Sequence, residues 1–451
     1  MTSLVWFRND LRTADNPALH DACEAPDEPV VGVYLVSEAQ HRSHHEGDPR
    51  LGFVRAHVLD LKEQLSALRI PLVIAPAPWF RDVPAALMAI ARAVGAGRLY
   101  FNAEYPLNEA RRDAAVQLAC ESYGIECHIR HGDVILPPGS VTKDDGAPYS
   151  VYTPFKRRWL DRVTRGELSP LPAPDRRRSI ASVPSSATDP TALDALPRRA
   201  PDDAWPVGEV AASKRLATFV DAALSGYRDE RDFPAKPGTS KLSAYLNLGA
   251  VSVRTCYARA AAEARSDGRE SWLSELIWRE FYRHVTAAFS HVSRGESFRQ
   301  ELDALPWRHD PDALAAWKAG ATGYPLVDAG LRELAETGFM HNRVRMVTAM
   351  FLTKHLLIDW REGEKHFMSH LRDADFASNN GGWQWSASTG TDAAPYFRIF
   401  NPTSQAKKFD PDDAYIRRFV PELTDGSRPY PEPIVDHARA RERALAFFKQ
   451  A

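Results

Sequence analysis

The sequence predicts two domains of different fold class, an α/β domain with a doubly wound parallel sheet followed by an all-α domain. Residues 1 to about 130 alternate short apolar runs with amphipathic stretches. From about residue 207 onward, apolar residues recur every three to four positions, which is the helical period. The stretch between these parts has little periodicity. We therefore expect an α/β domain over 1–130, an interdomain connector over 131–206 and a helical domain over 207–451.

The first part is predicted to form five strands separated by helices. The apolar runs predict strands over Leu4–Phe7, Val30–Val36, Leu72–Ile74, Leu99–Phe101 and Ile125–Ile129. The amphipathic stretches predict helices over Asn16–Glu24, Pro49–Leu68, Val83–Val94 and Asn108–Tyr123. Such alternation implies a parallel sheet with helices on both faces. No GxGxxG or Walker motif follows the first strand, so a standard dinucleotide or nucleoside triphosphate site is not expected here.

The connector is predicted to cross the surface between the domains. Lys156, Arg157 and Arg158 lie near a short helix, and a tract rich in Pro, Ser, Ala and Arg follows over Glu167–Pro206. The three consecutive arginines at 176–178 are compatible with a polyanion contact, but a solvated linker is the favoured interpretation.

The remainder of the chain is predicted to be helical, with no convincing strand, internal repeat or heptad run. Predicted helices span Ser213–Leu224, Leu242–Leu248, Ser252–Ala264, Ser271–Phe289, Asp310–Ala319, Tyr324–Thr337, Met340–Leu357 and Glu362–Leu371.

Bulk properties indicate a globular protein. The 451 residues are 44% hydrophobic and 26% charged, which allows two or three domains with ample core. The formal net charge is −2, so any nucleic-acid site must be a local basic patch. No segment has the length and apolar character of a membrane span, and the N-terminus lacks the order of a signal peptide. The four cysteines (Cys23, Cys120, Cys127, Cys256) form no CxxC pair, so we expect buried thiols in a reducing compartment, no disulfide and no metal site.

The stretch from Asp373 to Phe400 is the most chemically distinctive. It contains two acids, two adjacent amides, the glycine pair Gly381-Gly382, and two tryptophans one residue apart. Hydrogen-bonding groups beside large rings favour a pocket for a flat, heteroatom-rich ligand. The glycine pair is expected to break any helix. The alternative is an Asn-Gly turn with two tryptophans in nearby core.

Two further motifs have both a structural and a functional interpretation. The loop Gly238–Ser243 opens a helix with hydroxyls, free amides and Lys241, which suits a diphosphate, although an ordinary capped helix explains it too. In the helix WLSELIWREFYR, one face carries Glu275, Trp278, Arg279 and Tyr282. That face could bind the edge of a nucleic-acid base and a phosphate. Alternatively, Glu275 and Arg279 form a surface ion pair and Trp278 belongs to the core.

Other candidate residues depend on tertiary contacts. In GFMHNRVRM, Asn342, Arg345 and Met346 share a helical face, and Arg345 is expected to pair with Asp373 or Asp375. Scattered tryptophans would conduct electrons if they formed a row in space, although isolated tryptophans usually belong to the core.

These motifs together resemble the photolyase/cryptochrome family, and within it the class I cyclobutane pyrimidine dimer DNA photolyases. The resemblance spans nearly the whole chain, from VWFRNDLRTADNPAL through ILPPGSV, YTPFKRRWL, WLSELIWREFYRH, TGYPLVDAGLREL, MHNRVRM and LLIDWREGE to NNGGWQWSASTGTDAAPYFRIFNPTSQ. So many motifs in fixed order are very specific. The resemblance implies an antenna domain, a long connector and a helical domain that holds FAD in a U shape.

The resemblance also implies roles for individual residues. Cofactor-contacting positions are matched by Tyr227, Thr239, Ser240, Lys241, Leu242, Ser243, Trp272, Asp373 and Asp375, with Arg345 paired to Asp373 over the flavin and Asn379 beside flavin N5. The dimer pocket is matched by Glu275, Trp278, Asn342, Met346 and Trp385. Strand-contacting positions are matched by Arg231, Arg279, Tyr282, Arg343, Arg398 and Gln405, with Lys407 as a further candidate. The photoreduction chain is matched by Trp307, Trp360 and Trp383. Relatives often have arginine at Lys241, so the charge is kept but bidentate geometry is lost.

The implied activity is deoxyribodipyrimidine photo-lyase. Light-excited, fully reduced FAD would pass an electron to a dimer flipped out of ultraviolet-damaged DNA, and the electron would return after the ring splits. An antenna pigment is expected, with 5,10-methenyltetrahydrofolate favoured by His45, Asn108 and Glu109. Asn108 as a simple helix cap, 8-hydroxy-5-deazaflavin and an empty antenna site are the alternatives. We expect a cytoplasmic monomer with no obligate protein partner and no membrane association.

Three other functions are less consistent with the sequence. A light-sensing cryptochrome needs no dimer pocket, and the chain lacks a long tail after Phe448. A (6-4) photoproduct photolyase is expected to carry a histidine pair where Asn342 and Met346 stand. A generic electron-transfer flavoprotein would leave the WREFY face and the arginines unexplained.

Overall fold

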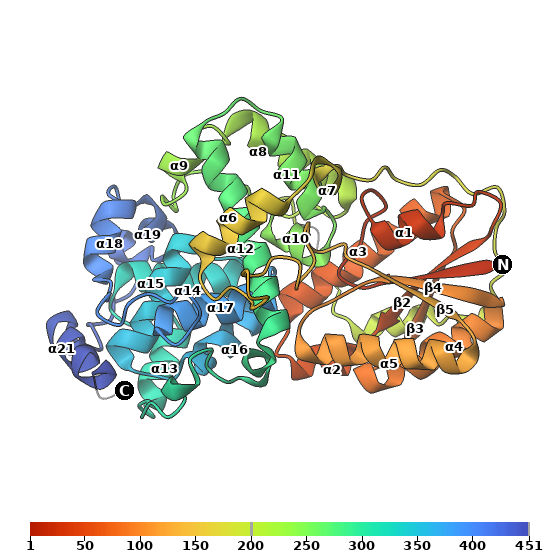
Figure 1. Cartoon of the computed structure of the whole chain (residues 1–451). Helices are drawn as coiled ribbons and strands as arrows, with labels where there is room; N and C mark the ends of the chain where they lie inside the picture. Colours follow the sequence, from red (N-terminus) through yellow and green to blue (C-terminus); the bar gives the residue numbers. More distant parts are fainter. Residues whose placement is uncertain (199–201, 450–451) are drawn as a thin grey trace.

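A computed structural model describes residues 1–198 and 202–449, and it contains an α/β half and a helical half (Figure 1). The five strands are β1 (Thr2–Phe7), β2 (Val30–Val36), β3 (Leu72–Pro76), β4 (Ala96–Asn102) and β5 (Glu126–Arg130). All pairings are parallel, and the spatial order is β3-β2-β1-β4-β5. The predicted strands and the doubly wound sheet are confirmed. In such sheets, ligands bind at the carboxyl ends of the strands where the order reverses, here between β1 and β4.

Alternating side chains of the strands supply the core on both faces of the sheet. Val5 and Phe7 of β1 belong to the core on one face, and Leu4 and Trp6 belong to the core on the other. The first core includes α1 (Pro17–Ala22) and α3 (Asp48–Ala67), and the second includes α4 (Val83–Val94) and α5 (Leu107–Tyr123). These four helices were predicted; α2 (Glu38–Ser43) and the turn η1 (Phe80–Asp82) were not.

The connector is more ordered than predicted. It contains α6 (Tyr152–Arg162), α7 (Arg165–Leu168) and the turns η2 (Ser185–Ala187) and η3 (Pro190–Ala195). It then follows the edge strand β3, where Asp189 N–H donates to the Ile74 carbonyl at 2.6 Å. The arginines at 176–178 were predicted to be solvated. This prediction is wrong for Arg177, whose side chain is 2% exposed. Its guanidinium donates to the carbonyls of Cys23 (2.7 Å), Ala25 and Glu28 (2.8 Å), and so fixes the connector to the α/β half.

The rest of the described chain is helical. It comprises α8 (Glu209–Ala222), α9 (Tyr227–Glu230), α10 (Ser243–Leu248), α11 (Val253–Ala261), α12 (Asp267–Ala288), η4 (Ser290–Arg294), η5 (Gln300–Leu302), α13 (Pro311–Lys318), α14 (Pro325–Thr337), α15 (Asn342–Met350), η6 (Phe351–Leu356), α16 (Trp360–His370), α17 (Phe376–Ala387), α18 (Pro402–Phe409), α19 (Ala414–Phe419), α20 (Glu422–Asp425) and α21 (His437–Phe448). The predicted all-α character is confirmed.

Two expectations about helices are corrected. The predicted helix Met340–Leu357 is α15 followed by the π-helical turn η6, and it ends at Leu357 in a left-handed conformation. More importantly, Gly381-Gly382 does not break a helix, because α17 continues through both glycines. The Asn-Gly turn considered as the alternative is therefore wrong as well. Tertiary packing at Gly381, described below, outweighs the low helix propensity of glycine.

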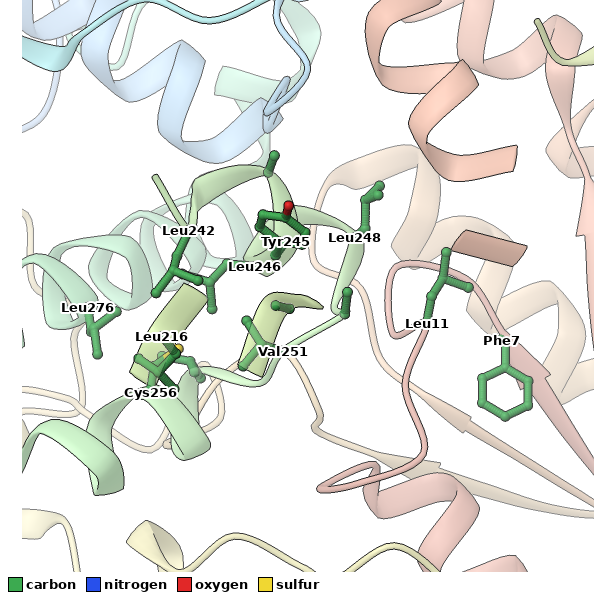
Figure 2. Close-up of a cluster of buried hydrophobic side chains, with 14 of the residues drawn as sticks. Phe7, Leu11, Leu216, Leu242, Tyr245, Leu246, Leu248, Val251, Cys256 and Leu276 are labelled. Carbon is green, nitrogen blue, oxygen red and sulfur yellow. The ribbon is translucent and has the colours of Figure 1, made fainter. Parts of the chain in front are cut away.

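The two halves share one continuous core. The cluster that begins at Phe7 and Leu11 continues into α8, α10, α11 and α12, and Figure 2 shows part of this continuity, from Phe7 to Leu276. The domain boundaries near 130 and 206 stay predictions. All four cysteines are free thiols; Cys23, Cys120 and Cys256 are buried, and Cys127 is half-buried. Within the described ranges, no helix has both the length and the apolar character needed to cross a bilayer.

The Arg177 anchor predicts a clear difference between neighbouring arginines. Arg177→Ala leaves three carbonyls without their charged donor and is expected to reduce the free energy of unfolding by about 2–4 kcal/mol. Denaturant unfolding, with proteolytic cleavage of the connector as a second readout, measures this effect. The exposed Arg178→Ala is the matched control, expected within about 0.5 kcal/mol of the parent. Equal stability of the two variants would refute the anchor.

Candidate active site

The N-terminus of α17 is fixed by an ion pair that the sequence analysis missed. The Asp375 carboxylate caps the helix by accepting from Ser378 N–H at 2.7 Å. It also accepts two hydrogen bonds from the Arg283 guanidinium, at 2.8 and 2.5 Å. Burial alone would raise the pKa of Asp375, but Arg283 lowers it well below its usual range, so the carboxylate is ionised. Arg283 was visible in the sequence as the last residue of WREFYR, but nothing indicated its partner.

Arg345 and Asp373 form the second ion pair beside this helix. One guanidinium nitrogen, Nη2, lies 2.9 Å from each oxygen of Asp373, and Nε donates to the Met340 carbonyl at 2.7 Å. The sequence left Asp373 and Asp375 open as partners of Arg345. The structure selects Asp373, since Asp375 is engaged by Arg283.

The two glycines of α17 have different surroundings. A Cβ at Gly381 would lie 2.2 Å from a ring carbon of Tyr282, so glycine permits the close crossing of α12 and α17. A Cβ at Gly382 would meet nothing within 4 Å, and Gly382 is exposed although it lies in mid-helix. Gly382 therefore borders open space, as expected of a backbone that a flat ligand approaches closely.

Asn379 presents an acceptor beside that space. Its Nδ2 donates to the Glu364 carbonyl at 3.1 Å, which fixes the amide and leaves Oδ1 available for a ligand. The neighbouring Asn380 has a purely internal role, because it donates to the Glu364 carboxylate at 3.0 Å and accepts from Gln384 at 2.8 Å.

Anion-binding groups gather at the predicted diphosphate loop. Within the described residues, the backbone N–H groups of Thr239, Ser240 and Lys241 donate to no other protein group. The Lys241 ammonium and the Arg345 guanidinium both lie 5.6 Å from the centre of the Phe339 ring. The helix α10 that follows has only six residues, so the free amides and Lys241 supply the site rather than a long helix dipole.

His341 supplies an additional unpaired donor. Its Nδ1 accepts from Arg343 N–H at 3.2 Å, and burial lowers its pKa to about 4, so the neutral ring carries its proton on Nε2. This buried Nε2 has no hydrogen-bond partner in the described part of the chain. Buried polar groups normally have partners. A buried donor, free loop amides and open space at Gly382 fit a large polar cofactor such as FAD. Among the other matched cofactor positions, Tyr227, Leu242 and Trp272 are buried, and Ser243 is exposed.

Glu275 and Arg279 of α12 do not pair with each other. Glu275 accepts from Arg231 at 2.5 Å, whereas Arg279 donates to Asp133 and to the Leu246 carbonyl. The alternative of a surface Glu275–Arg279 pair is therefore wrong. Arg279 is largely buried by its internal contacts, so its predicted contact with a nucleic-acid strand stays a prediction.

Trp278 and Tyr282 lie on the same face of α12. Trp278 is half-buried and stacks on Tyr152 of the connector, and it is tilted against Tyr282 at 5.8 Å between ring centres. Sequence reasoning missed Tyr152, because a ring 126 positions away gives no local signal. Met346 and Trp385 are half-buried and Asn342 is exposed, so all three have accessible surface.

Several predicted strand-contacting residues occupy one region. Arg343 pairs with Asp232, the neighbour of Arg231, at 2.7 Å, and its guanidinium lies 4.5 Å from the ring centre of Phe409 on α18. Gln405 is on the same helix, and its Oε1 lacks a partner among the described residues. Arg398 and Lys407 are exposed. This arrangement suits contacts to successive phosphates.

Two of the three predicted relay tryptophans are buried, and the third is half-buried. Trp383 is 2% exposed and packs on Gly363, whose Cβ would lie 2.1 Å from the indole. Trp360, three residues earlier on α16, is fully buried, and its indole N–H has no partner in the described structure. Trp307 is half-buried and contacts Phe447 of α21 at 5.3 Å between ring centres.

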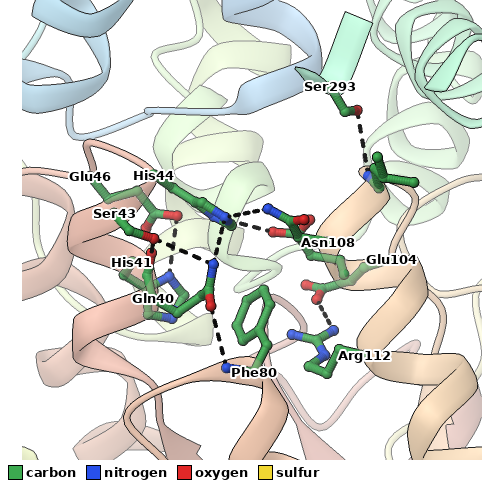
Figure 3. Close-up of polar contacts among 12 residues, drawn as sticks. Gln40, His41, Ser43, His44, Glu46, Phe80, Glu104, Asn108, Arg112 and Ser293 are labelled. Atoms are coloured by element: carbon green, nitrogen blue, oxygen red, sulfur yellow. Dashed lines mark hydrogen bonds and ion pairs between the residues drawn. The ribbon is translucent and has the colours of Figure 1, made fainter. Parts of the chain in front are cut away.

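A cavity of about 440 Å³ lies between the two halves at the carboxyl ends of β1 and β4. His45, Asn108 and Glu109 line it, as do Asp375 and Arg283 from the helical half. Figure 3 shows that His44, which was not predicted, joins the polar groups. His44 Nε2 lies 2.9 Å from Asn108 Nδ2, and its Nδ1 lies 3.6 Å from a Glu109 oxygen. Burial lowers the pKa of His44 and raises that of Glu109 to about 7.

Comparisons with known proteins identify the family of the chain. The family model described as DNA photolyase matches residues 3–175, and that described as the FAD binding domain of DNA photolyase matches residues 272–450. The deoxyribodipyrimidine photo-lyase of Escherichia coli is 42% identical over 100% of this chain and 99% of its own length. The Vibrio cholerae protein of the same name is 40% identical over 99% of each chain.

Solved structures show the same fold. A class III photolyase from Agrobacterium tumefaciens superposes with a TM-score of 0.90 at 36% identity, covering 100% of this chain and 97% of that chain. A cryptochrome from Synechocystis superposes with a TM-score of 0.87 at 29% identity, covering 99% of each chain.

The two glycines of α17 provide a matched pair of variants. Both substitutions to alanine gain helix propensity, but only Gly381→Ala clashes with Tyr282, so we expect it to be less stable than Gly382→Ala by about 1–3 kcal/mol. Gly382→Ala should instead reduce the amount of FAD that copurifies. Thermal unfolding of the cofactor-free protein and the flavin absorbance of the purified protein test the two effects. Equal stability would contradict the close crossing, and unchanged flavin content would remove Gly382 from the cofactor site.

Proposed function

The chain belongs to the DNA photolyase family, and from this premise we propose that it uses FAD and light to split cyclobutane pyrimidine dimers in DNA. The carrying observation is that α17, which bears Asn379, Gly382 and Trp385, begins at two ion pairs and packs through Gly381 on Tyr282 of α12. Bound FAD in its reduced form would supply an electron to the dimer on excitation and recover it after ring cleavage.

We assign FAD binding to groups that lack internal partners. The free amides of the loop at Thr239–Lys241 and the Lys241 ammonium would bind the diphosphate. Asn379 Oδ1 would accept a hydrogen bond at the reactive edge of the ring system, because Nδ2 is held by Glu364. The Arg345–Asp373 pair would contribute fixed polarity that needs no reorganisation during electron transfer.

The dimer pocket is assigned to Trp278 and Trp385 as stacking surfaces. Glu275 and Asn342 would hydrogen-bond the base edges, and Met346 would fill the space between them. Glu275 is already ion-paired with Arg231, so this acceptor is oriented before the DNA arrives. A covalent dimer stacks and pairs poorly, which reduces the cost of flipping it out of the duplex.

Binding of the damaged strand is assigned to the surface that carries Arg231, Arg343 and Gln405. These side chains would contact phosphates and so bind without regard to sequence and with a strong dependence on salt. Arg398 and the candidate Lys407 would extend this surface. The net charge of −2 means that such a local patch, and not the overall field, attracts DNA.

The row Trp383–Trp360–Trp307 is assigned to photoreduction of the cofactor. Trp360 Nε1 has no acceptor among the described residues, so an oxidised Trp360 would retain its proton. The half-buried Trp307 has access to solvent, where a proton can leave. This order favours movement of the oxidised site from the interior to the surface.

The cavity between the halves is assigned to the antenna pigment, with 5,10-methenyltetrahydrofolate favoured. His44 orients Asn108, and Glu109 provides a carboxylate for the amino edge of a pterin. The shared lining of this cavity by Asp375 and Arg283 brings the antenna close to the flavin site. We further propose that the protein acts as a cytoplasmic monomer.

Removal of the Trp278 ring should separate dimer recognition from cofactor binding. Because base stacking on an aromatic ring contributes about 1–3 kcal/mol per base, Trp278→Ala is expected to weaken dark binding of dimer-containing oligothymidine about 5- to 150-fold. FAD content should be unchanged, and repair of the parent protein should require light. Tyr123→Ala is the control, since it removes an exposed aromatic ring at the end of α5 in the α/β half. Unchanged affinity of Trp278→Ala, or repair in the dark, would refute the assignment.

Antenna binding should depend on pH through Glu109. The pKa of Glu109 is raised to about 7 by burial, so the acceptor form is present above pH 7 and is lost below it. Folate affinity should therefore fall about tenfold for each pH unit below 7. The bound pigment's absorbance between pH 5.5 and 7.5 measures this, and Glu109→Gln should be weaker and independent of pH. A flat profile for the parent protein would contradict the role of Glu109.

A further inference from the structure

We propose that Tyr152 of the connector is a positioning residue that holds the Trp278 indole in place for the dimer. The inference rests on the proposed dimer pocket and extends it to a segment predicted only to link the domains. In this proposal, Tyr152 fixes the Trp278 side chain before DNA binds.

The geometry of the two rings carries the inference. Their centres are 3.6 Å apart and their planes differ by 11°, so Tyr152 stacks directly on one face of the Trp278 indole. Phe281 and Tyr282 contact other sides of the indole, at 5.6 and 5.8 Å between ring centres. Trp278 nevertheless remains half-buried. Only the face opposite Tyr152 is therefore left for a base.

Tyr152 is itself held from both ends. It is 6% exposed, and its hydroxyl donates to the Ser274 carbonyl at 2.7 Å and lies 2.6 Å from Ser274 Oγ. Ser274 lies four residues before Trp278, one turn along the same face of α12. One side chain thus bridges two consecutive turns: its hydroxyl binds the first, and its ring packs on the second.

The backbone around Tyr152 connects to the other side of the pocket. Tyr152 N–H donates to the Asp392 carboxylate at 3.1 Å, and the Ser150 carbonyl accepts from Thr391 Oγ1 at 2.6 Å. Thr391 and Asp392 belong to the segment that follows Trp385, and Ala394 N–H returns to the Trp385 carbonyl at 3.2 Å. The Tyr152 segment therefore fixes the separation of the two proposed stacking surfaces.

This arrangement gives the tyrosine a specific role. An indole that is already immobile loses little conformational freedom when a base stacks on it, so dimer affinity benefits from order established beforehand. Tyr152 would act entirely through Trp278 and would not touch the DNA. Its contribution should consequently vanish when the indole is absent.

A double-mutant cycle tests this dependence. Tyr152→Leu keeps an apolar side chain but removes the ring, and it should weaken dark binding of a dimer-containing oligonucleotide about 2- to 10-fold. In the Trp278→Ala background, the same substitution should cause no further loss. Tyr152→Phe retains the ring and should restore affinity to within about twofold of the parent. Leu160→Ala, on the exposed part of α6, is the control and should bind like the parent.

FAD content and the thermal midpoint serve as independent readouts. In Tyr152→Phe, FAD content should be unchanged, and the midpoint should fall only by the small amount that the loss of one hydrogen bond causes. An equal loss from Tyr152→Leu with and without Trp278 would overturn the proposal, as would parent-like affinity of Tyr152→Leu. Should Trp278→Ala alone bind dimer DNA as tightly as the parent, the proposed pocket itself fails. Loss in Trp278→Ala without loss in Tyr152→Leu rejects only the positioning role.

Discussion

The two carboxylates at the start of α17 determine where the proposed reactive groups of that helix lie. Asp375 is both the helix cap and the partner of Arg283, so the first turn of α17 is fixed to α12. Asp373, two residues earlier, is fixed to α15 through Arg345. Removing one partner from such a buried pair leaves an uncompensated charge, which is far more costly than losing an exposed salt bridge. This constraint permits a helix containing Gly381-Gly382 to present Asn379, Trp383 and Trp385 in fixed directions.

The connector contributes to the site as well as to the link between the halves. Glu280 of α12 accepts N–H groups from Ile135 and Leu136 at 2.7 and 2.9 Å, and Asp133 pairs with Arg279 and Arg283. The same connector supplies Tyr152. Because Arg283 contacts both Asp133 and Asp375, the cavity between the halves and the proposed flavin site share one continuous set of ion pairs. The halves therefore form a single functional unit with a common core.

Local pattern predicted most of the fold but few of the partners. Buried parallel strands have long apolar runs and amphipathic helices have a clear period, so both were visible in the sequence. The sequence left Asp373 and Asp375 as possible partners of Arg345, and the structure contains the pair with Asp373. The helix through Gly381-Gly382 was missed because glycine disfavours helices locally, and only the ring of Tyr282, 99 positions away, explains it. Arg177, His44 and Tyr152 were missed because the residues that they contact are distant in sequence.

In the proposed complex, flavin and dimer occupy adjacent positions between α12, α15 and α17. The most direct measurement is the excited-state lifetime of reduced FAD in the protein, with and without bound DNA. The account predicts that a dimer-containing oligonucleotide shortens this lifetime and that an undamaged oligonucleotide of the same sequence does not. An unchanged lifetime while the damaged DNA is bound would place the dimer too far from the flavin for electron transfer and would contradict the account.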